Sequence, residues 1–409
     1  MISVQNRLLQ LSGNKYFSLI FIGLYLSACS PKVQPIHKEV PPEVVKVEEK
    51  KPEKKFTEAT ISLLIPFNLQ EFRTKPATKA EVEKHALAID FYQGFKLGID
   101  SAAATGMDFK LQVFDSGDNQ SEVGSVINSN RLKGSNLIVG PVFPDGLKLI
   151  TPYSIREKIP VVSPLAASQP SEFNNPNLIS VVNNIQLHAT KIGDYVIKKY
   201  TPAQTVVVLI NTKSPADEIL GGPLRNYFAG DKGKKLSFQE YASVFTMEMK
   251  IVKTKKYVVM LSSSDQKFVT ATLNKLVKMK RAGFDIDLIG HPDWIKQNYS
   301  IENLQALNTV ISASYLVNYK SAAVIDFVKK YRKAYSFEPG EYAFKGFDIG
   351  FYFAKQLAAH GENYLKYLKE EKYKGLHNTF TFQQDEQLGY INTSLMLLNY
   401  KGFSLNVIE

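Results

Sequence analysis

Cysteine and tryptophan are almost absent from this chain, because its 409 residues include one of each. A single cysteine excludes an internal disulfide and any zinc site built on cysteines. Aromatic residues as a class are plentiful, with 21 tyrosines and 25 phenylalanines. The length and a hydrophobic content of 44% are sufficient for one large or two medium domains with a sizeable core.

The N-terminal stretch MISVQNRLLQLSGNKYFSLIFIGLYLSACS accounts for the one cysteine. Its apolar run, from Phe17 to Leu26, is too short to span a bilayer and is typical of a secretory signal. The run ends in LSAC, which resembles the lipobox of bacterial lipoproteins. This resemblance implies a signal peptide over residues 1–28 and a lipidated Cys29. The alternative is that Cys29 is a buried core cysteine.

Residues 29–56 predict a disordered tether, because lysine, glutamate, proline and valine alternate there without an amphipathic period. No acidic cluster follows Cys29, so we expect a lipid anchor in the outer or inner membrane and a protein that faces the periplasm. Removing Arg7 and Lys15 with the signal lowers the formal net charge from +11 to +9. A nucleic-acid partner is not expected for an exported lipoprotein.

Beyond the tether, short apolar runs alternate with segments of helical period. ATISLLIPF, FKLQVFDSGD, NLIVGP and IPVVSPLAAS predict strands of one series, and TVVVLIN, SFQEYASV, KYVVMLSSSD and DIDLIGHPDW predict strands of a second. Nearly continuous Val, Ile and Leu in strands separated by helices is typical of a parallel sheet covered on both faces. We therefore predict an α/β protein with two doubly wound parallel-sheet lobes, whose ligand lies beyond the carboxyl ends of the strands.

The order of these segments resembles the type I periplasmic binding proteins, in particular the leucine/isoleucine/valine-binding group that serves ABC transporters. The resemblance is carried by ISLLIPF, FYQGFKLGID, LIVGPVFPDGLKLITPYSIREKIPVVSPLAAS and FVKKYRKAYSFEPGEYAFKGFDIG, and it covers about residues 57–409. It implies two lobes joined by three crossovers, with a ligand cleft between them. By this resemblance lobe 1 takes about 57–183 and 314–370, and lobe 2 takes 184–313 and 371–409.

Several positions depart from the pattern of the amino-acid binders in this group. Phe143 and Pro144 stand where small hydroxyl residues usually meet the ligand carboxylate, and NTKSPADE replaces a tyrosine-glycine turn. A free amino acid is therefore not expected, because its charges are costly to bury without partners. The candidate cleft residues are Asn68, Phe143, Asp145, Ser163, Ala167, Ser168, Asn211, Ser263, Asp293 and Trp294.

The segment GHPDW places an aromatic ring beside a carboxylate, a pair suited to stacking on a sugar ring or a cation. The alternative is a strand-end turn with a partly buried Trp294. No metal site is expected from His291 and Asp293, since no second cluster supports them, and no cofactor is expected. The basic stretches KTKK, KLVKMKR and FVKKYRKAY predict solvated helix faces, with a patch for an anionic partner as the alternative.

These observations predict a lipid-anchored periplasmic solute-binding protein that closes two lobes on a small polar ligand, such as an amino-acid-like molecule, a peptide or a sugar fragment, for an ABC permease. The alternative is an envelope interaction module, such as an activator of a cell-wall synthase, that uses the same fold as a protein-docking surface. No enzyme is expected, because the sequence has no nucleophile elbow. Asp348 in YAFKGFDIG is interpreted as structural.

Overall fold

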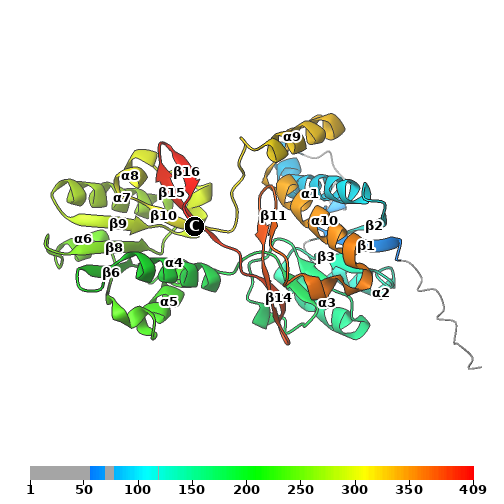
Figure 1. Ribbon diagram of the computed structural model, residues 1–409, viewed down its shortest axis with the longest axis horizontal. Coiled ribbons are helices and arrows are strands. Elements are labelled where there is room, and N and C mark those ends of the chain that lie inside the picture. The colour runs from blue at the N-terminus through cyan, green and yellow to red at the C-terminus, as the bar shows by residue number, and fades with distance from the viewer. Residues whose placement is uncertain (1–55, 70–77, 118) are drawn as a thin grey trace, which may run out of the picture. The chain divides into compact units, whose positions relative to one another are not determined.

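Two seven-stranded sheets organise the chain (Figure 1). The computed structural model describes residues 56–69, 78–117 and 119–409. The predicted signal peptide, Cys29 and the tether up to residue 55 lie outside the described residues. Within the described ranges, no helix combines the length and the apolar character needed to cross a membrane.

The first sheet has the strand order β13-β14-β5-β4-β3-β1-β2, and only its edge strand β13 runs antiparallel to its neighbour. Its strands are β1 (Glu58–Ile65), β2 (Asp108–Asp115), β3 (Leu137–Val139), β4 (Val161–Ser163), β5 (Leu178–Ser180), β13 (Phe382–Asp385) and β14 (Gly389–Asn392). The helices and short strands of this lobe are α1 (Lys79–Ala103), α2 (Gln120–Asn128), α3 (Pro144–Glu157), η2 (Pro170–Glu172), α9 (Ala322–Tyr335), α10 (Glu341–His360), η5 (Gly361–Tyr367), β11 (Tyr373–Lys374) and β12 (Thr379–Phe380).

The second sheet has the order β16-β15-β10-β9-β8-β6-β7, in which β15 and β16 are antiparallel to their neighbours. Its strands are β6 (Thr205–Ile210), β7 (Ser237–Tyr241), β8 (Lys256–Leu261), β9 (Asp285–Ile289), β10 (Val310–Ala313), β15 (Met396–Lys401) and β16 (Ser404–Val407). Its helices are α4 (Ile185–Lys199), α5 (Pro215–Ala229), η3 (Gly233–Lys235), α6 (Val244–Glu248), α7 (Gln266–Arg281), η4 (Pro292–Lys296) and α8 (Ile301–Ala306).

Strand β6 shows why the apolar runs fold as covered strands. All six of its residues are buried. Val206 and Val208 pack into one apolar cluster, whereas Val207 and Leu209 pack into another. Successive side chains of a strand point to opposite faces, so both faces of this sheet are covered. The doubly wound arrangement predicted from the sequence is confirmed.

The segment VGPVFPDG turns sharply at the end of β3. Gly140 has φ of +91°, and a Cβ at this position would overlap the carbonyl of Leu64. Glycine is therefore required, because it alone adopts this backbone conformation without a side-chain clash. Phe143 then precedes α3, and Pro144 occupies the first turn of that helix, where its fixed φ is compatible.

The chain returns from the first lobe to the second at a later residue than the sequence suggested. Strands β13 and β14 belong to the first sheet, and only β15 and β16 return to the second. The predicted boundary at residue 371 therefore differs from the observed sheets, in which the first lobe extends to Asn392. Residues 373–392 form strands of two to four residues, which carry too little periodicity to indicate the sheet edge that they join.

Helices α1 and α10 pack with their backbones in direct contact. A Cβ at Gly94 of α1 would overlap Ala343 of α10, and a Cβ at Gly346 of α10 would overlap the carbonyl of Phe91. A Cβ at Gly98 or at Gly350 would likewise overlap the backbone of the facing helix. These glycines allow an approach that any other residue would prevent.

We expect Gly346→Ala to destabilise the protein by about 1–3 kcal/mol or more, since the added methyl group forces the two helices apart. Chemical unfolding of the purified full chain would measure this. Gly222→Ala in α5 is the matched control, because the nearest atom to its new Cβ is 3.6 Å away in a flexible glutamate side chain. Equal stability of the two variants would contradict the packing argument.

Candidate ligand site

Three of the sequence candidates meet in one pocket. Phe143 at the start of α3, with Ala167 and Ser168 in the loop after β4, line a cavity of about 450 Å³. We call this cavity the lysine pocket; its other lining residues are Leu87, Val142, Pro144, Leu165, Ala166, Lys296, Tyr342 and Lys345. All of them belong to the first lobe except Lys296, which ends η4 in the second. The pocket therefore takes residues from both lobes, as a ligand cleft must.

Two ammonium groups dominate the lysine pocket. Lys345 Nζ lies 2.7 Å from Glu341 Oε1, and Lys296 Nζ lies 3.5 Å from the same oxygen. One carboxylate thus faces two cations, and no acidic side chain is among the lining residues. The side chain of Lys345 is 13% exposed, whereas that of Lys296 is 48% exposed. The two lysines together therefore carry one positive charge more than Glu341 balances, and the half-exposed Lys296 lies at the open side of the site.

The pKa values of this pair follow from burial and from each partner. Burial lowers the pKa of Lys345, against the opposing effect of Glu341. Burial acts to raise the pKa of Glu341, but the charge and hydrogen bond of Lys345 outweigh it and the pKa is lowered. A buried ammonium with a lowered pKa gains from any further anionic partner.

Aromatic rings complete the surroundings of the two lysines. Lys345 Nζ lies 5.2 Å from the ring centre of Tyr315 and 5.1 Å from that of Tyr342. Tyr315 also stacks on His377, with 4.2 Å between ring centres. Burial, and then the charge of Lys345, lowers the pKa of His377 to about 3, so this imidazole is neutral at pH 7. The excess positive charge therefore comes from the lysines alone.

The first turn of α10 is fixed by a carboxylate of α1. Asp90 accepts hydrogen bonds from the backbone amides of Gly340 (3.2 Å) and Ala343 (2.9 Å). These amides belong to a helix start, which has no partners within the helix. Glu341 and Lys345 are four residues apart and share one face of the same helix. Asp90 therefore sets where that face lies.

A second buried carboxylate holds the returning chain beside this face. Asp348 of α10 accepts hydrogen bonds from the backbone amides of Leu376, His377 and Asn378, each 2.8 Å long. Burial raises the pKa of Asp348 to about 7, although the three amide donors oppose that rise. The structural role predicted for Asp348 is confirmed. Through these bonds the helix positions His377 and the aromatic stack.

Asp145 lines a neighbouring pocket instead of the lysine pocket. This second cavity, of about 290 Å³, lies at the ends of β2 and β3 and shares Phe143 and Pro144 with the first. Asp145 is exposed in the first turn of α3. Its carboxylate is therefore not placed to neutralise Lys296 or Lys345 within the lysine pocket.

The ring of Trp294 is not available for stacking on a ligand in this structure. It is 1% exposed, packs in the core of the second lobe, and donates from Nε1 to the backbone oxygen of Ser263 (3.0 Å). Ser263 is itself buried, and its hydroxyl accepts from the amide of Asp265. The stacking interpretation is therefore wrong for this structure, and the alternative of a strand-end turn with a buried Trp294 holds, because the ring packs in the core and its N–H has a partner. Asp293 remains exposed beside His291 Nδ1, at 3.6 Å.

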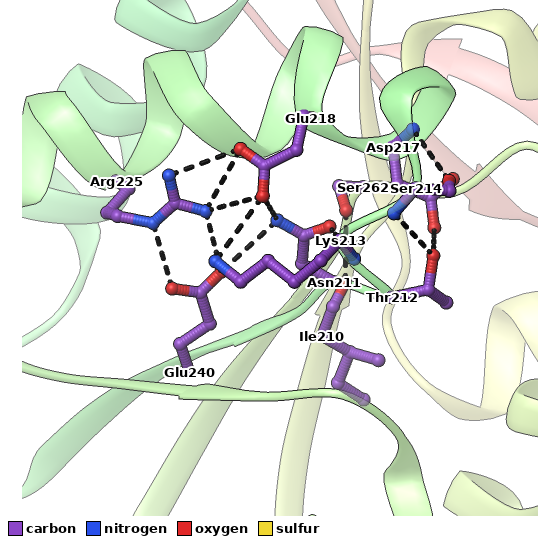
Figure 2. Close-up of polar contacts among 10 residues, drawn as sticks. All are labelled: Ile210, Asn211, Thr212, Lys213, Ser214, Asp217, Glu218, Arg225, Glu240 and Ser262. Atoms are coloured by element: carbon purple, nitrogen blue, oxygen red, sulfur yellow. Dashed lines mark hydrogen bonds and ion pairs between the residues drawn. The ribbon is translucent and has the colours of Figure 1, made fainter.

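Asn211 is committed to an ion network rather than to a cleft (Figure 2). Its side-chain nitrogen donates to Glu218 (2.8 Å) and Glu240 (3.1 Å), and its oxygen accepts from the amide of Lys213. Arg225 donates to both carboxylates, with a paired contact to Glu240. Both amide hydrogens are therefore used within the network and the residue is fully buried, so its predicted role as a ligand contact is corrected. It fastens α5 to β7.

The two remaining candidates lie in the first lobe, away from the lining of the lysine pocket. Asn68 has φ of +53°, donates from its backbone to Asp115, and lies 3.3 Å from His85 Nδ1 through its side chain. Ser163 is 2% exposed at the end of β4, between β3 and β5. Asn68 and Ser163 therefore contribute to the structure of the strand ends.

Five of the eleven basic residues in the three basic stretches have ion pairs within the protein. Lys256 contacts Asp285 and Asp287, at 2.9 and 3.1 Å. Lys275 pairs with Glu248, Lys330 with Asp326, and Arg332 with Glu338. The paired residues are fixed by local carboxylates, as expected for solvated helix faces.

Sequence reasoning missed Lys296, Tyr342 and Lys345. The signal was present for two of them, because Tyr342 and Lys345 lie in EYAFKGFDIG, where a lysine interrupts an apolar helix. Of that segment, only Asp348 was interpreted from the sequence. Lys296 carried no signal of its own, since it is one of many lysines that follow a strand.

Comparisons with known proteins place the fold. No family model and no curated protein matches the sequence. Solved structures do match, over 86% of this chain. They include a putative branched-chain amino acid ABC transporter protein from Rhodospirillum rubrum (13% identity, all of that chain, TM-score 0.64) and an ABC transporter substrate-binding protein from Desulfitobacterium hafniense in complex with Leu (15%, 100%, 0.53). A solute-binding protein from Rhodopseudomonas palustris BisB5, in complex with 3,4-dihydroxybenzoic acid, matches similarly (16%, 96%, 0.51).

These matches agree with the two sheets and their crossovers. The described part of the chain has the two-lobed fold of the type I periplasmic binding proteins, as the sequence predicted. Identities of 13–16% establish the fold and nothing finer.

The ion network of Asn211 gives a pH prediction. Hydrogen bonds from Arg225 lower the pKa of Glu240 to about 2, below its ordinary value near 4.5. The resulting stabilisation is complete above about pH 4.5 and is lost as the pH falls toward 2. We expect Glu240→Gln to cost about 1 kcal/mol at pH 7 and progressively less below pH 4.5.

Urea unfolding of wild type and variant at several pH values measures this difference. The exposed Glu370→Gln is the matched control and should change stability by less than about 0.5 kcal/mol. A Glu240→Gln deficit that stays constant down to pH 2.5 would show that the carboxylate charge is not what stabilises this network.

Proposed function

We propose that this chain is a lipid-anchored solute-binding protein that faces the periplasm and closes two lobes on a small polar ligand, delivering it to an ABC transporter. The observation that carries this proposal is the lysine pocket, since a cavity lined by both lobes and bearing unbalanced charge suits a small molecule. The pocket is proposed to bind its ligand without a catalytic step.

Lobe closure is supported by the nature of the contact across the pocket. Lys296 of the second lobe reaches Glu341 of the first through a single, half-exposed ion pair of 3.5 Å. Such pairs contribute only about 0–1 kcal/mol, so the lobes can separate and close again at little cost. A ligand that contacts both sides would favour the closed state by its extra contacts.

The fold neighbours support a transport role by analogy. Their names connect them to ABC transporters, and the bound molecules are leucine in one case and 3,4-dihydroxybenzoic acid in another. Both are small molecules with a carboxylate and an apolar body. For this chain we propose a ligand of comparable size.

A thermal unfolding screen tests the proposed function. The purified full chain would be heated with amino acids, short peptides, sugars, cell-wall fragments and organic acids. A ligand at a hundred times its dissociation constant should stabilise the folded state by about 2.7 kcal/mol, a shift of several degrees. Stabilisation by one class is expected. No shift with any class, in a protein that unfolds cooperatively, would contradict a solute-binding role.

One observation favours a second candidate, the envelope interaction module. Phe245 and Met249 lie four residues apart at α6 and are 58% and 74% exposed, and Val252 just beyond is 53% exposed. Exposed apolar side chains that gather on one face are typical of protein-docking surfaces. A flat ligand screen would direct attention to this face, with a cell-wall synthase or its like as the partner.

Lipid anchoring through Cys29 has a separate test. We expect Cys29→Ser to leave the protein without a lipid and to move it from the membrane fraction to the soluble fraction of bacterial cells. Fractionation with mass measurement of the mature protein would detect both changes. Ser27→Ala is the control, because it keeps the cysteine and should remain membrane-bound. A Cys29→Ser protein that stays in the membrane fraction would exclude this anchor.

A further inference from the structure

We propose that the lysine pocket selects a small organic carboxylate with an apolar body and no ammonium group, held by Lys345 and Lys296. This inference rests on the proposed solute-binding function and names the ligand class. The inference follows from the positive charge of the pocket, its apolar lining and the absence of a free carboxylate in that lining.

The charge of the pocket requires an anion. Lys345 and Lys296 share the single carboxylate of Glu341, which approaches both through the same oxygen. The other buried titratable group at this point, His377, is neutral at pH 7. Because Lys345 is nearly buried, an additional carboxylate would form a charge-assisted hydrogen bond in a setting of low dielectric.

The walls of the pocket require an apolar body. Phe143 is 45% exposed although it is a large aromatic residue, and it faces the cavity together with Val142 and Leu165. Ala166 and Ala167 leave space on the same side. A flat or branched hydrocarbon would remove these apolar surfaces from water, which favours binding. A sugar would have few side-chain acceptors for its hydroxyl groups, since Ser168 and Tyr342 are the only uncharged side chains with a hydroxyl in the lining and the two lysines only donate.

The lining also excludes an α-amino acid. An ammonium group in this pocket would meet two lysines, and the nearest carboxylate, Glu341, is already shared between them. A buried cation without a partner is strongly unfavourable. The volume of about 450 Å³ is within the range of about 300–1,000 Å³ for small-molecule sites. The pocket therefore fits a monocarboxylate better than a zwitterion of the same size.

Calorimetric titration of the full chain in lipid nanodiscs tests this selection. Benzoate and hexanoate are the carboxylate probes, benzamide and hexanamide are their neutral matches, and phenylalanine is the zwitterion. We expect each carboxylate to bind about ten to a hundred times more tightly than its amide, since a hydrogen bond to a charged group is worth about 1.5–3 kcal/mol. Phenylalanine is expected to bind no better than benzamide.

Variants of the two lysines locate the effect. Lys345→Met and Lys296→Met should each weaken benzoate binding at least about tenfold and leave benzamide binding unchanged. Lys345→Arg, which keeps the charge, should retain most of the affinity. Lys355→Met on the exposed side of α10 is the matched control and should bind as wild type does. Since Lys296 is half exposed, its variant will fold even if the Lys345 variant does not.

Two results would overturn the inference. One is equal binding of benzoate, benzamide and phenylalanine; the other is benzoate binding that both lysine variants retain. If sugars or peptides stabilise the protein while no carboxylate binds, the ligand class is wrong and the solute-binding function stands. If no ligand of any class binds, both proposals fail.

Discussion

The direct packing of α10 against α1 is the contact on which the candidate site depends. Glycines on both helices remove the side chains that would hold the two backbones apart. Asp90 of α1 then binds the first amides of α10. Because Glu341, Tyr342 and Lys345 occupy the first turns of that helix, this contact fixes one charged wall of the lysine pocket. The same two helices thus provide core stability and site geometry.

Buried polar groups at the crossovers between the lobes hold the chain segments that lie beside the site. Asp348 binds three consecutive amides of the returning chain, and Asn392 is fully buried with bonds to Val181 and Thr379. These bonds satisfy backbone groups that would otherwise be left without partners as the chain passes between lobes. By contrast, the pair between Lys296 and Glu341 is half exposed. The chain segments at the crossovers are therefore fixed by several buried bonds, whereas the ion pair across the pocket is a single contact open to solvent.

Much of the fold could be predicted because its signals are local. Apolar runs such as TVVVLI identify covered strands, and the glycine and proline of VGPVFPDG mark a strand end whose loop lines the lysine pocket. The order of these segments was enough to indicate two doubly wound lobes. Short strands after residue 371 were not assignable, because two to four residues carry no period and the pairing partner lies about two hundred residues away.

The candidate site, like the fold, could be predicted from the sequence only in part. The sequence by itself determined the loops that reach the pocket, through Phe143, Ala167 and Ser168, and it indicated that an amino-acid ligand lacks its usual partners. Only the tertiary structure decided that Trp294 and Asn211 are internal, and that Lys296 and Lys345 converge on one carboxylate. The reason is physical: a strand or a turn is specified by neighbours in the chain, whereas burial and charge pairing depend on residues that folding brings together from different lobes.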